Sequence, residues 1–192
     1  MKLKKNVLKL IKWVSLFLVA IVLAMLTPFI MFFVGIMTMP NPPTPEVKYA
    51  EFPFKLEYEL NGEISVVEDI LICEFDGFER LGTAGTYRRW NSYLKSENET
   101  ILLLDVRPLE EVTERGTKIL ELYFSWGTAG YYMGDNSRNA GGAQSFSYIS
   151  SKYQKVDGEV GYSAYLAEEA WEKYKIRLIS WEIADPIENT FK

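Results

Sequence analysis

Acid-base chemistry in this chain would depend on carboxylates, because the sequence contains no histidine. This excludes Ser-His-Asp and Cys-His nucleophilic sites, and histidine-ligated zinc, iron and copper. Paired carboxylates, the device of glycosidases, leave a small hydrolase as an alternative function. Both runs of neighbouring carboxylates have the pattern of solvated loop or helix surface, and we expect no catalytic residue and no enzyme activity. The two runs are Glu110, Glu111 and Glu114, and Glu168, Glu169 and Glu172.

Oxygen-bearing side chains alternate in a glycine- and asparagine-rich stretch, at Asp135, Ser137 and Asn139. Such alternation begins the calcium loop of an EF-hand. The twelfth position counted from Asp135 is Phe146, where that loop requires a bidentate glutamate. We therefore expect an ordinary polar loop, with no metal site and no cofactor.

Aromatic residues gather on the same stretch, which has no hydrophobic period over 127–142 and is predicted to be a long loop. Aromatic side chains on a loop held by a rigid sheet can stack on sugars or anchor a protein partner. The competing interpretation is core packing, because 23 Phe, Trp and Tyr residues follow position 39 and most must build the interior. The predicted binding residues are Trp126, Tyr131, Tyr132, Met133, Asp135 and Asn136.

Two further features have plainer interpretations. Arg88, Arg89 and Trp90 could contact a small anion or an aromatic ligand, but we interpret this segment as a solvated strand face. Cys73 is the single cysteine, so an intrachain disulfide is excluded. It lies in the apolar stretch 70–75 and is predicted to be a buried strand residue.

The position of the chain in the cell follows from its first 39 residues. Residues 14–39 contain no charged side chain, which exceeds the roughly 20 residues needed to cross a bilayer core. Five lysines precede this run, at positions 2, 4, 5, 9 and 12, and positive charge keeps that end in the cytoplasm. A cleaved signal peptide is the main alternative, but its apolar region spans only about 7–15 residues. We predict a single-pass anchor in the cell membrane, with the C-terminal domain outside.

The proline-rich stretch and the distribution of charge divide the chain into four predicted segments. We predict a cytoplasmic basic segment at 1–13, a transmembrane signal anchor at 14–39, a proline-rich linker at 40–48 and an extracytoplasmic domain at 49–192. All 26 acidic residues but only 16 of the 21 basic residues lie from Glu46 onward, so this part has a net charge of −10. Nucleic-acid binding needs a basic surface, and we expect no nucleic-acid partner.

Hydrophobic patterning predicts an α+β fold, in which the transmembrane helix precedes a β-rich domain. Residues 52–60 alternate, and Asn61-Gly62 predicts a hairpin turn into a strand at 64–75. Segments 86–95, 101–106, 118–126 and 146–153 also have strand patterns, while 107–116 is left open between a loop and a short helix. A late helix is expected, capped by Ser163, followed by a central strand at 175–184. The domain is expected to be a sandwich or an antiparallel sheet with this one helix.

Several segments resemble uncharacterised single-pass membrane-anchored proteins of Gram-positive bacteria. These are the lysine-led anchor, EFPFKLEYELNGE at 51–63, YYMGDN at 131–136 and ISWEIADPIENTF at 179–191. The resemblance implies a cell-surface setting and carries over no activity or functional residue. Together these features favour a membrane-tethered, non-catalytic module, whose partners are the bilayer through residues 14–39 and a protein or envelope polysaccharide. A cell-wall carbohydrate-binding module is the alternative, followed by the hydrolase.

Overall fold

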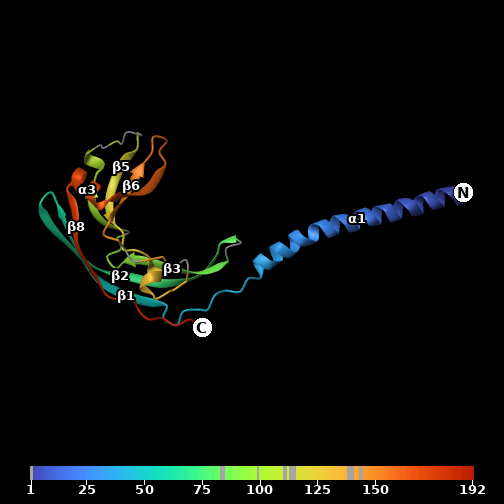
Figure 1. Cartoon of the computed structure of the whole chain (residues 1–192), viewed down its shortest axis with the longest axis horizontal. Helices are drawn as coiled ribbons and strands as arrows, with labels where there is room; N and C mark the ends of the chain where they lie inside the picture. The colour runs from blue at the N-terminus through green and yellow to red at the C-terminus, as the bar shows by residue number, and fades with distance from the viewer. Residues whose placement is uncertain are drawn as a thin grey trace. The chain divides into compact units, whose positions relative to one another are not determined.

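The computed structural model describes residues 2–82, 85–98, 100–109, 112, 116–137, 141–142 and 145–192, with side chains from residue 12 onward. Within these residues the chain has an α+β fold, as predicted, with a long N-terminal helix and eight strands (Figure 1). In chain order the elements are α1 (Lys2–Met37), β1 (Tyr49–Leu60), β2 (Glu63–Arg80), β3 (Thr86–Leu94), β4 (Ile101–Asp105), the 3-10 turn η2 (Arg107–Leu109), β5 (Lys118–Phe124), α2 (Ala129–Tyr132), β6 (Tyr148–Gln154), β7 (Val160–Leu166), α3 (Ala167–Tyr174) and β8 (Ile176–Ile183).

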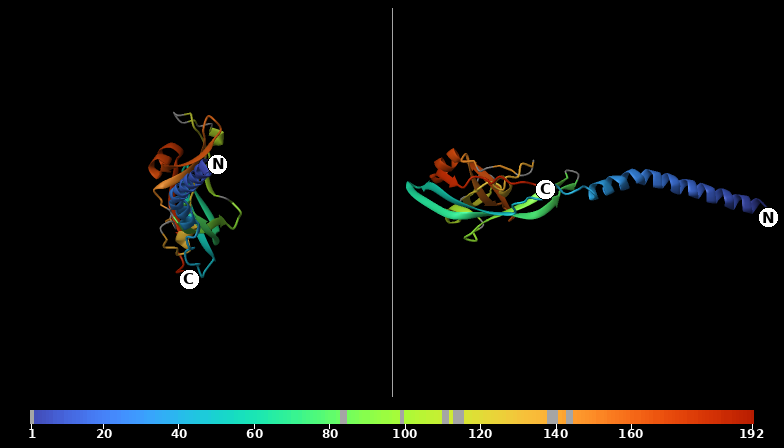
Figure 2. Two further views of the ribbon diagram at one scale, coloured as in Figure 1. Left: turned by 90° about the vertical axis from the view of Figure 1, so that its right-hand side faces the viewer. Right: turned by 90° about the horizontal axis from the view of Figure 1, so that it is seen from below.

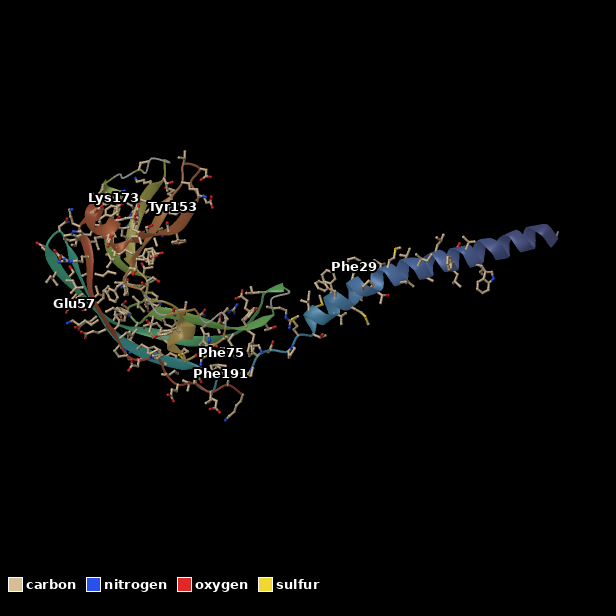
Figure 3. All side chains as sticks on the ribbon, in the orientation of Figure 1. Phe29, Glu57, Phe75, Tyr153, Lys173 and Phe191 are labelled. Atoms are coloured by element: carbon tan, nitrogen blue, oxygen red, sulfur yellow. The ribbon has the colours of Figure 1, made fainter. Side chains whose placement is uncertain are left out.

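Helix α1 is continuous through Pro28 and exposes its apolar side chains. Phe29 projects outward from the helix in Figure 3, and 65% of its surface is exposed. The Thr27 hydroxyl donates to the Leu23 carbonyl at 2.7 Å, so this polar group is satisfied within the helix itself. The segment Lys12–Met37 is long and apolar enough to cross a membrane, and none of it is buried by the rest of the chain.

Residues 1–42 form one compact unit with the segment Glu79–Tyr87, which contains the end of β2 and the start of β3. The Arg80 guanidinium donates to the carbonyls of Met37 at 2.8 Å and Met39 at 3.3 Å. Carbonyls at the end of a helix lack partners within the helix. Arg80 therefore supplies donors, and a favourable positive charge, at the C-terminal end of α1.

The second compact unit, Pro43–Phe78 with Arg88–Lys192, contains two four-stranded sheets. The first sheet has the order β3-β2-β1-β8 and the second the order β4-β5-β6-β7. The predicted hairpin between β1 and β2 is confirmed: the strands pair antiparallel from Tyr49↔Glu74 to Leu60↔Glu63. Asn61 and Gly62 both have positive φ angles, of 54° and 88°, as a tight hairpin turn requires.

One buried cluster receives side chains from both sheets and from α3, which is the arrangement of a two-layer sandwich. Phe52, Phe54 and Leu56 enter it from alternate positions of β1, and Leu122 and Phe124 enter it from β5. Figures 1 and 2 show α3 beside the turn end of the β1–β2 hairpin. The Asn61 amide donates to the Lys175 carbonyl there at 3.0 Å, which ties the residue after α3 to that turn.

The late helix begins later than predicted. Ser163 is not its cap but lies within β7, and the helix starts at Ala167 after Leu166. Strand β7 has no strong strand signal of its own, because it is short and contains Gly161 and Ser163. Its conformation comes from seven antiparallel pairs with β6, from Tyr148↔Leu166 to Gln154↔Val160.

Three other predictions also need correction. Strand β8 was expected to be central but lies at the edge of its sheet, although Ile176 at its start is fully buried. Strand β2 continues past Asp76-Gly77 to Arg80, because Gly77 accommodates a φ of 87° without ending the strand. The loop predicted at 127–142 contains the short helix α2. For 107–116, of which 110, 111 and 113–115 lie outside the described residues, the structure describes a 3-10 turn at Arg107–Leu109.

The second half of the predicted 40–48 linker pairs with the C-terminal segment. The Thr44 amide donates to the Lys192 carbonyl at 2.7 Å, and the Lys192 amide donates back at 2.9 Å. Pro45 forms an antiparallel bridge with Phe191 and is fully buried. The proline-rich pattern predicted a linker, but it could not show that Pro45 has a bridge partner 146 residues away.

Candidate functional site

The predicted binding loop contributes most of its aromatic residues to the core. We call Trp126, Tyr132 and Met133 the loop cluster. They are 8%, 2% and 0% exposed. The Tyr132 hydroxyl donates to the Trp126 carbonyl at 2.6 Å, and the Trp126 indole donates to the Ser92 hydroxyl at 3.1 Å. Burial raises the pKa of Tyr132 to about 12. These side chains pack the interior, and their polar groups are already satisfied.

Asp135 is held by a set of hydrogen bonds that sequence analysis did not identify. Its carboxylate accepts from Arg88 Nε at 2.8 Å and Nη2 at 2.7 Å, and from the Trp90 indole at 2.8 Å. The Asp135 side chain is fully buried, and that of Arg88 is 9% exposed. Burial by itself would raise the pKa of Asp135, but the hydrogen bonds from Arg88, Trp90 and Ser137 outweigh it and hold that pKa well below its usual range.

Arg88 links this carboxylate to both ends of the domain, so it does not lie on a solvated strand face. Its Nη1 donates to the Pro43 carbonyl at 3.1 Å, and its guanidinium lies 4.2 Å from the centre of the Phe191 ring. Only Arg89 matches the predicted exposure; its side chain is 49% exposed and pairs with Asp76 at 2.7 Å. The Arg88–Asp135 pair therefore joins the loop, the linker and the C-terminal segment.

Two of the six predicted binding residues, Tyr131 and Asn136, are exposed. Together with Asp135 they line a cavity of about 580 Å³ against Pro186–Asn189. The C-terminal segment is packed closely there, since a Cβ on Gly134 would lie 2.3 Å from the Ile187 carbonyl oxygen. The Asn189 side chain is itself engaged with the Val47 backbone at 2.8 and 3.0 Å. The polar groups that line this cavity mainly serve to hold the segment in place.

The calcium pattern is interrupted in the same region. Both carboxylate oxygens of Asp135 accept hydrogen bonds from Arg88, so they would have to release it to ligate a cation. Asn139 lies outside the described residues. Among the residues that the structure does describe, no three His, Cys, Asp or Glu side chains are grouped as metal ligands.

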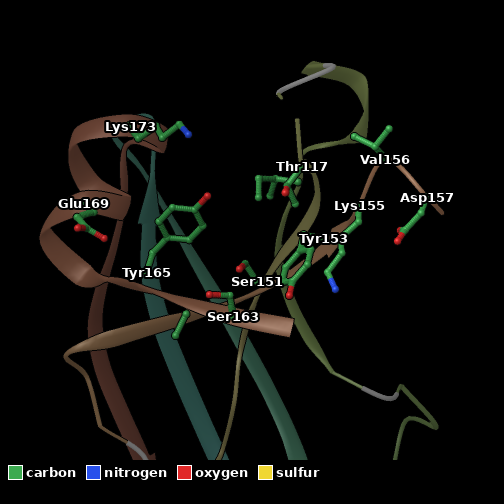
Figure 4. Close-up of a pocket in the computed structure, with 12 residues that line it drawn as sticks. Thr117, Ser151, Tyr153, Lys155, Val156, Asp157, Ser163, Tyr165, Glu169 and Lys173 are labelled. Carbon is green, nitrogen blue, oxygen red and sulfur yellow. The ribbon is translucent and has the colours of Figure 1, made fainter. Parts of the chain in front are cut away.

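A larger cavity, of about 1020 Å³, lies over β5, β6 and β7 beside α3. We call it the tyrosine cavity, because Tyr153 and Tyr165 line it from neighbouring strands. Figure 4 shows Tyr165 with Glu169 and Lys173 on one side, Tyr153 on the other, and Ser151 and Ser163 between the two tyrosines. Figure 3 places the labelled Tyr153 and Lys173 at the α3 end of the domain.

The cavity exists because small polar residues stand where the core pattern requires large apolar ones. Ile149 on β6 is fully buried in the core, and Ser151 is the next residue on the same strand face. Ser151 pairs directly with Ser163 on β7. Two serines cannot fill the space between this sheet and α3, so an open volume remains. Polar residues at core-facing positions are expected chiefly where a sequence serves a function.

The carboxylates that line the cavity accept hydrogen bonds from backbone amides. Glu169 accepts from the Leu166 amide at 3.2 Å and caps the start of α3. Asp157 accepts from the Glu159 amide at 3.1 Å in the turn after β6. Glu168 and Glu172 are exposed on α3, as predicted, and Glu110, Glu111 and Glu114 lie outside the described residues. A hydrolytic pair would have to recruit carboxylates that already stabilise a helix end and a turn.

Sequence reasoning missed the tyrosine cavity because the second part of β7, from Ser163 onward, was assigned to the late helix. With that assignment, Tyr153 and Tyr165 could not be placed on adjacent strands. A usable signal existed in the alternation of Ile149, Ser151 and Tyr153, in which serine interrupts an otherwise apolar strand face.

Comparison with known proteins finds no matching family model, no similar curated protein and no similar solved structure. Function must therefore be argued from the geometry and chemistry of the site.

Proposed function

We propose that this chain is a single-pass membrane protein that holds a non-catalytic binding domain on the outer face of the cell membrane. The observation that carries this proposal is the exposure of Lys12–Met37, none of which is buried by the rest of the chain. Leaving a large apolar side chain in water instead of burying it costs about 1.5–3 kcal/mol. The many exposed apolar side chains of this helix support a place for it in lipid.

The orientation follows from charge. All five lysines of the first 39 residues precede the apolar run, and lysines flanking a span favour the cytoplasmic side. The part from Glu46 onward is strongly acidic and is repelled by anionic lipid head groups. The folded domain would therefore stand off the outer surface, where it can meet envelope components.

We assign the binding role to the tyrosine cavity. It combines aromatic rings, hydroxyl groups and open volume, which are the features of a small-ligand site. The loop cluster lacks accessible surface for the same task, since Trp126, Tyr132 and Met133 are buried. The non-catalytic assignment is supported by the lack of histidine in the sequence and by the structural use of Glu169 and Asp157.

Topology can be tested with single introduced cysteines in the full chain. Cys73 is fully buried, and burial raises its pKa to about 12, so the native thiol should not react with a maleimide. We expect a membrane-impermeant maleimide to label Glu63→Cys in intact cells, because Glu63 is exposed in the domain. Asn6→Cys is the matched control and should react only after permeabilisation.

The reverse labelling pattern would overturn the orientation. Recovery of the chain in the medium, shortened beyond residue 39, would show that the apolar helix is a cleaved signal. Extraction of the intact chain from membranes by carbonate alone would also contradict a spanning helix.

The binding role can be tested by photo-crosslinking in intact cells. Val156 lies at the cavity rim and is 85% exposed, so a photoreactive residue there should capture the bound component. Leu102, 45% exposed on the opposite face of the second sheet, is the control position. We expect a defined product from position 156 only, reduced by Tyr165→Ala. Equal products at both positions, or none at either, would contradict binding at this cavity.

A further inference from the structure

The floor of the tyrosine cavity is formed by paired residues of β6 and β7, whose positions are set by the register of the two strands. Three cross-strand rows face it: Tyr153↔Gly161, Ser151↔Ser163 and Ile149↔Tyr165. The two tyrosines therefore lie at opposite ends of this floor, on different strands. Four positions along a strand separate them, a distance of about 13 Å, with the serine pair in the middle.

Gly161 fixes the position of one ring. A Cβ at Gly161 would lie 2.5 Å from Cζ and from the hydroxyl oxygen of Tyr153. The Tyr153 ring therefore lies across β7 in the space that a larger residue would occupy. Any other residue at position 161 would displace this ring from the cavity floor.

The second ring is fixed by aromatic packing. Tyr165 contacts Tyr174 of α3 edge to face, with ring centres 5.7 Å apart and an angle of 80° between the rings. The Lys173 ammonium lies 5.8 Å from the centre of the Tyr165 ring. Both tyrosines are thus held in place before any ligand arrives, which lowers the entropic cost of binding.

The serine pair offers hydrogen-bonding capacity between the two rings. Ser151 is fully buried, and its hydroxyl has no hydrogen-bond partner in the part of the chain that the structure describes. A buried hydroxyl without a partner is destabilising by about 1–3 kcal/mol, so native proteins rarely retain one without a reason. A ligand hydroxyl above the cavity floor would supply the missing partner.

The charges around the cavity are balanced and already engaged. Lys155 pairs with Glu159 at 2.6 Å, and Asp157 and Glu169 accept backbone amides. Among the described residues that line the cavity, two are lysines and two are carboxylates, so this part of the lining has no net charge to select an anion or a cation. Recognition must therefore depend on aromatic faces and hydroxyl groups.

We propose that the tyrosine cavity binds a short, uncharged oligosaccharide. Sugar rings present C–H faces that pack on aromatic rings and hydroxyl groups that pair with serine. Tyrosines at the two ends and hydroxyls between them match a chain of a few sugar units. This proposal rests on the proposed function of the domain as a binding module, and it names the ligand class of the same cavity.

The test uses the full chain in phosphatidylcholine nanodiscs, because the head groups of many detergents are themselves sugars. Isothermal titration with cellohexaose, maltohexaose and hexa-N-acetylchitohexaose covers three uncharged sugars, and trigalacturonic acid is the anionic comparison. We expect at least one uncharged hexasaccharide to bind and the acidic sugar not to bind.

Variants at cavity residues are compared with a variant at an exposed residue outside the cavity, to show whether the cavity residues bind the sugar. Tyr153→Ala and Tyr165→Ala should each weaken binding about tenfold, as at other aromatic contacts in a binding centre. Ser151→Ala should weaken it about threefold to tenfold, the range of one hydrogen bond. Tyr162→Ala is the matched control, since Tyr162 is on β7, on the face opposite to that of Gly161 and Ser163, and is 66% exposed. It should leave affinity unchanged.

The failure of this inference is distinguishable from failure of the proposed function. If position 156 captures a protein or an acidic polymer in cells and no uncharged hexasaccharide binds at millimolar concentration, the binding role stands and the ligand class is wrong. Preferential binding of trigalacturonic acid, or an equal loss from Tyr162→Ala, would also overturn the inference. The intrinsic tryptophan fluorescence of each variant confirms that it is folded.

Discussion

The loop cluster and the tyrosine cavity are both aromatic, but they differ in what their polar groups contact. In the loop cluster the Tyr132 hydroxyl and the Trp126 indole have partners within the chain. In the cavity the Ser151 hydroxyl has no hydrogen-bond partner among the described residues, and the flanking tyrosines are only partly buried. An aromatic cluster is therefore a binding candidate when it combines accessible rings with unused hydrogen-bonding capacity. A high local density of aromatic residues is not sufficient.

The largest expected effect is the loss of the Asp135 carboxylate, which holds the loop in place. Asp135→Ala leaves Arg88 buried without its partner, and breaking a buried pair in this way typically costs about 4 kcal/mol. We expect a correspondingly lower urea midpoint for the full chain, followed by tryptophan fluorescence. Asp157→Ala is the exposed control and should shift the midpoint only slightly. Similar shifts for the two variants would show that the loop is not built around Asp135.

Truncation of Met133 should have the next largest effect. Its side chain is fully buried, so Met133→Ala leaves a void and should lower the free energy of unfolding by about 3 kcal/mol. Oligosaccharide binding by the folded variant should be unchanged, because Met133 is not among the residues that line the tyrosine cavity. The same denaturation and titration experiments measure both quantities. A loss of affinity without a loss of stability would reverse the roles assigned to the two regions.

Acid should weaken the loop through Asp135. Its pKa is depressed in the folded chain, so its contribution to stability is complete above the unfolded value near pH 4 and is lost as pH falls further. Asp135→Asn removes this contribution, of about 2–3 kcal/mol for a strongly depressed carboxyl. The stability difference between the wild type and this variant should be constant from pH 7 to 5 and decrease below pH 4. A difference that persists unchanged at pH 3 would contradict the assigned pKa shift.

The smallest expected change in stability is at Ser151. Because its buried hydroxyl has no internal hydrogen-bond partner among the described residues, Ser151→Ala removes an unpaired polar group and should increase the free energy of unfolding by about 1 kcal/mol. Its effect should instead appear in ligand affinity, in contrast to Met133→Ala. Denaturation and titration of the same preparation give both numbers. A loss of 1 kcal/mol or more in stability would indicate that the hydroxyl has a structural role.

Several elements could be predicted because their signals are local. The alternation in Tyr49–Leu60 and the Asn61-Gly62 turn define the first hairpin. The length of the uncharged run predicts α1, which is long and apolar enough to cross a membrane. The α+β class follows from these patterns together with the late helix. Each depends on residues within a few positions of one another.

The wrong predictions occur where contacts with distant segments, and not the local sequence pattern, decide the structure. Val160–Leu166 is a strand because β6 pairs with it, so the cap assigned to Ser163 was wrong. The apolar residues of β8 suggested a central strand, yet the core packs against its start at an edge of the sheet. The predicted binding residues illustrate the same limit, since most of them are buried by contacts with distant segments.

The sequence by itself determined the long uncharged helix, the acidic composition of the following domain, the first hairpin and the exclusion of histidine chemistry. Only the tertiary structure placed Arg88 against Asp135, 47 residues away, and brought Ser151 opposite Ser163 between two tyrosines. The physical reason is that propensities and turn signals act over a few residues, whereas strand register is set by the packing of a whole sheet. Both the buried ion pair and the cavity depend on that register.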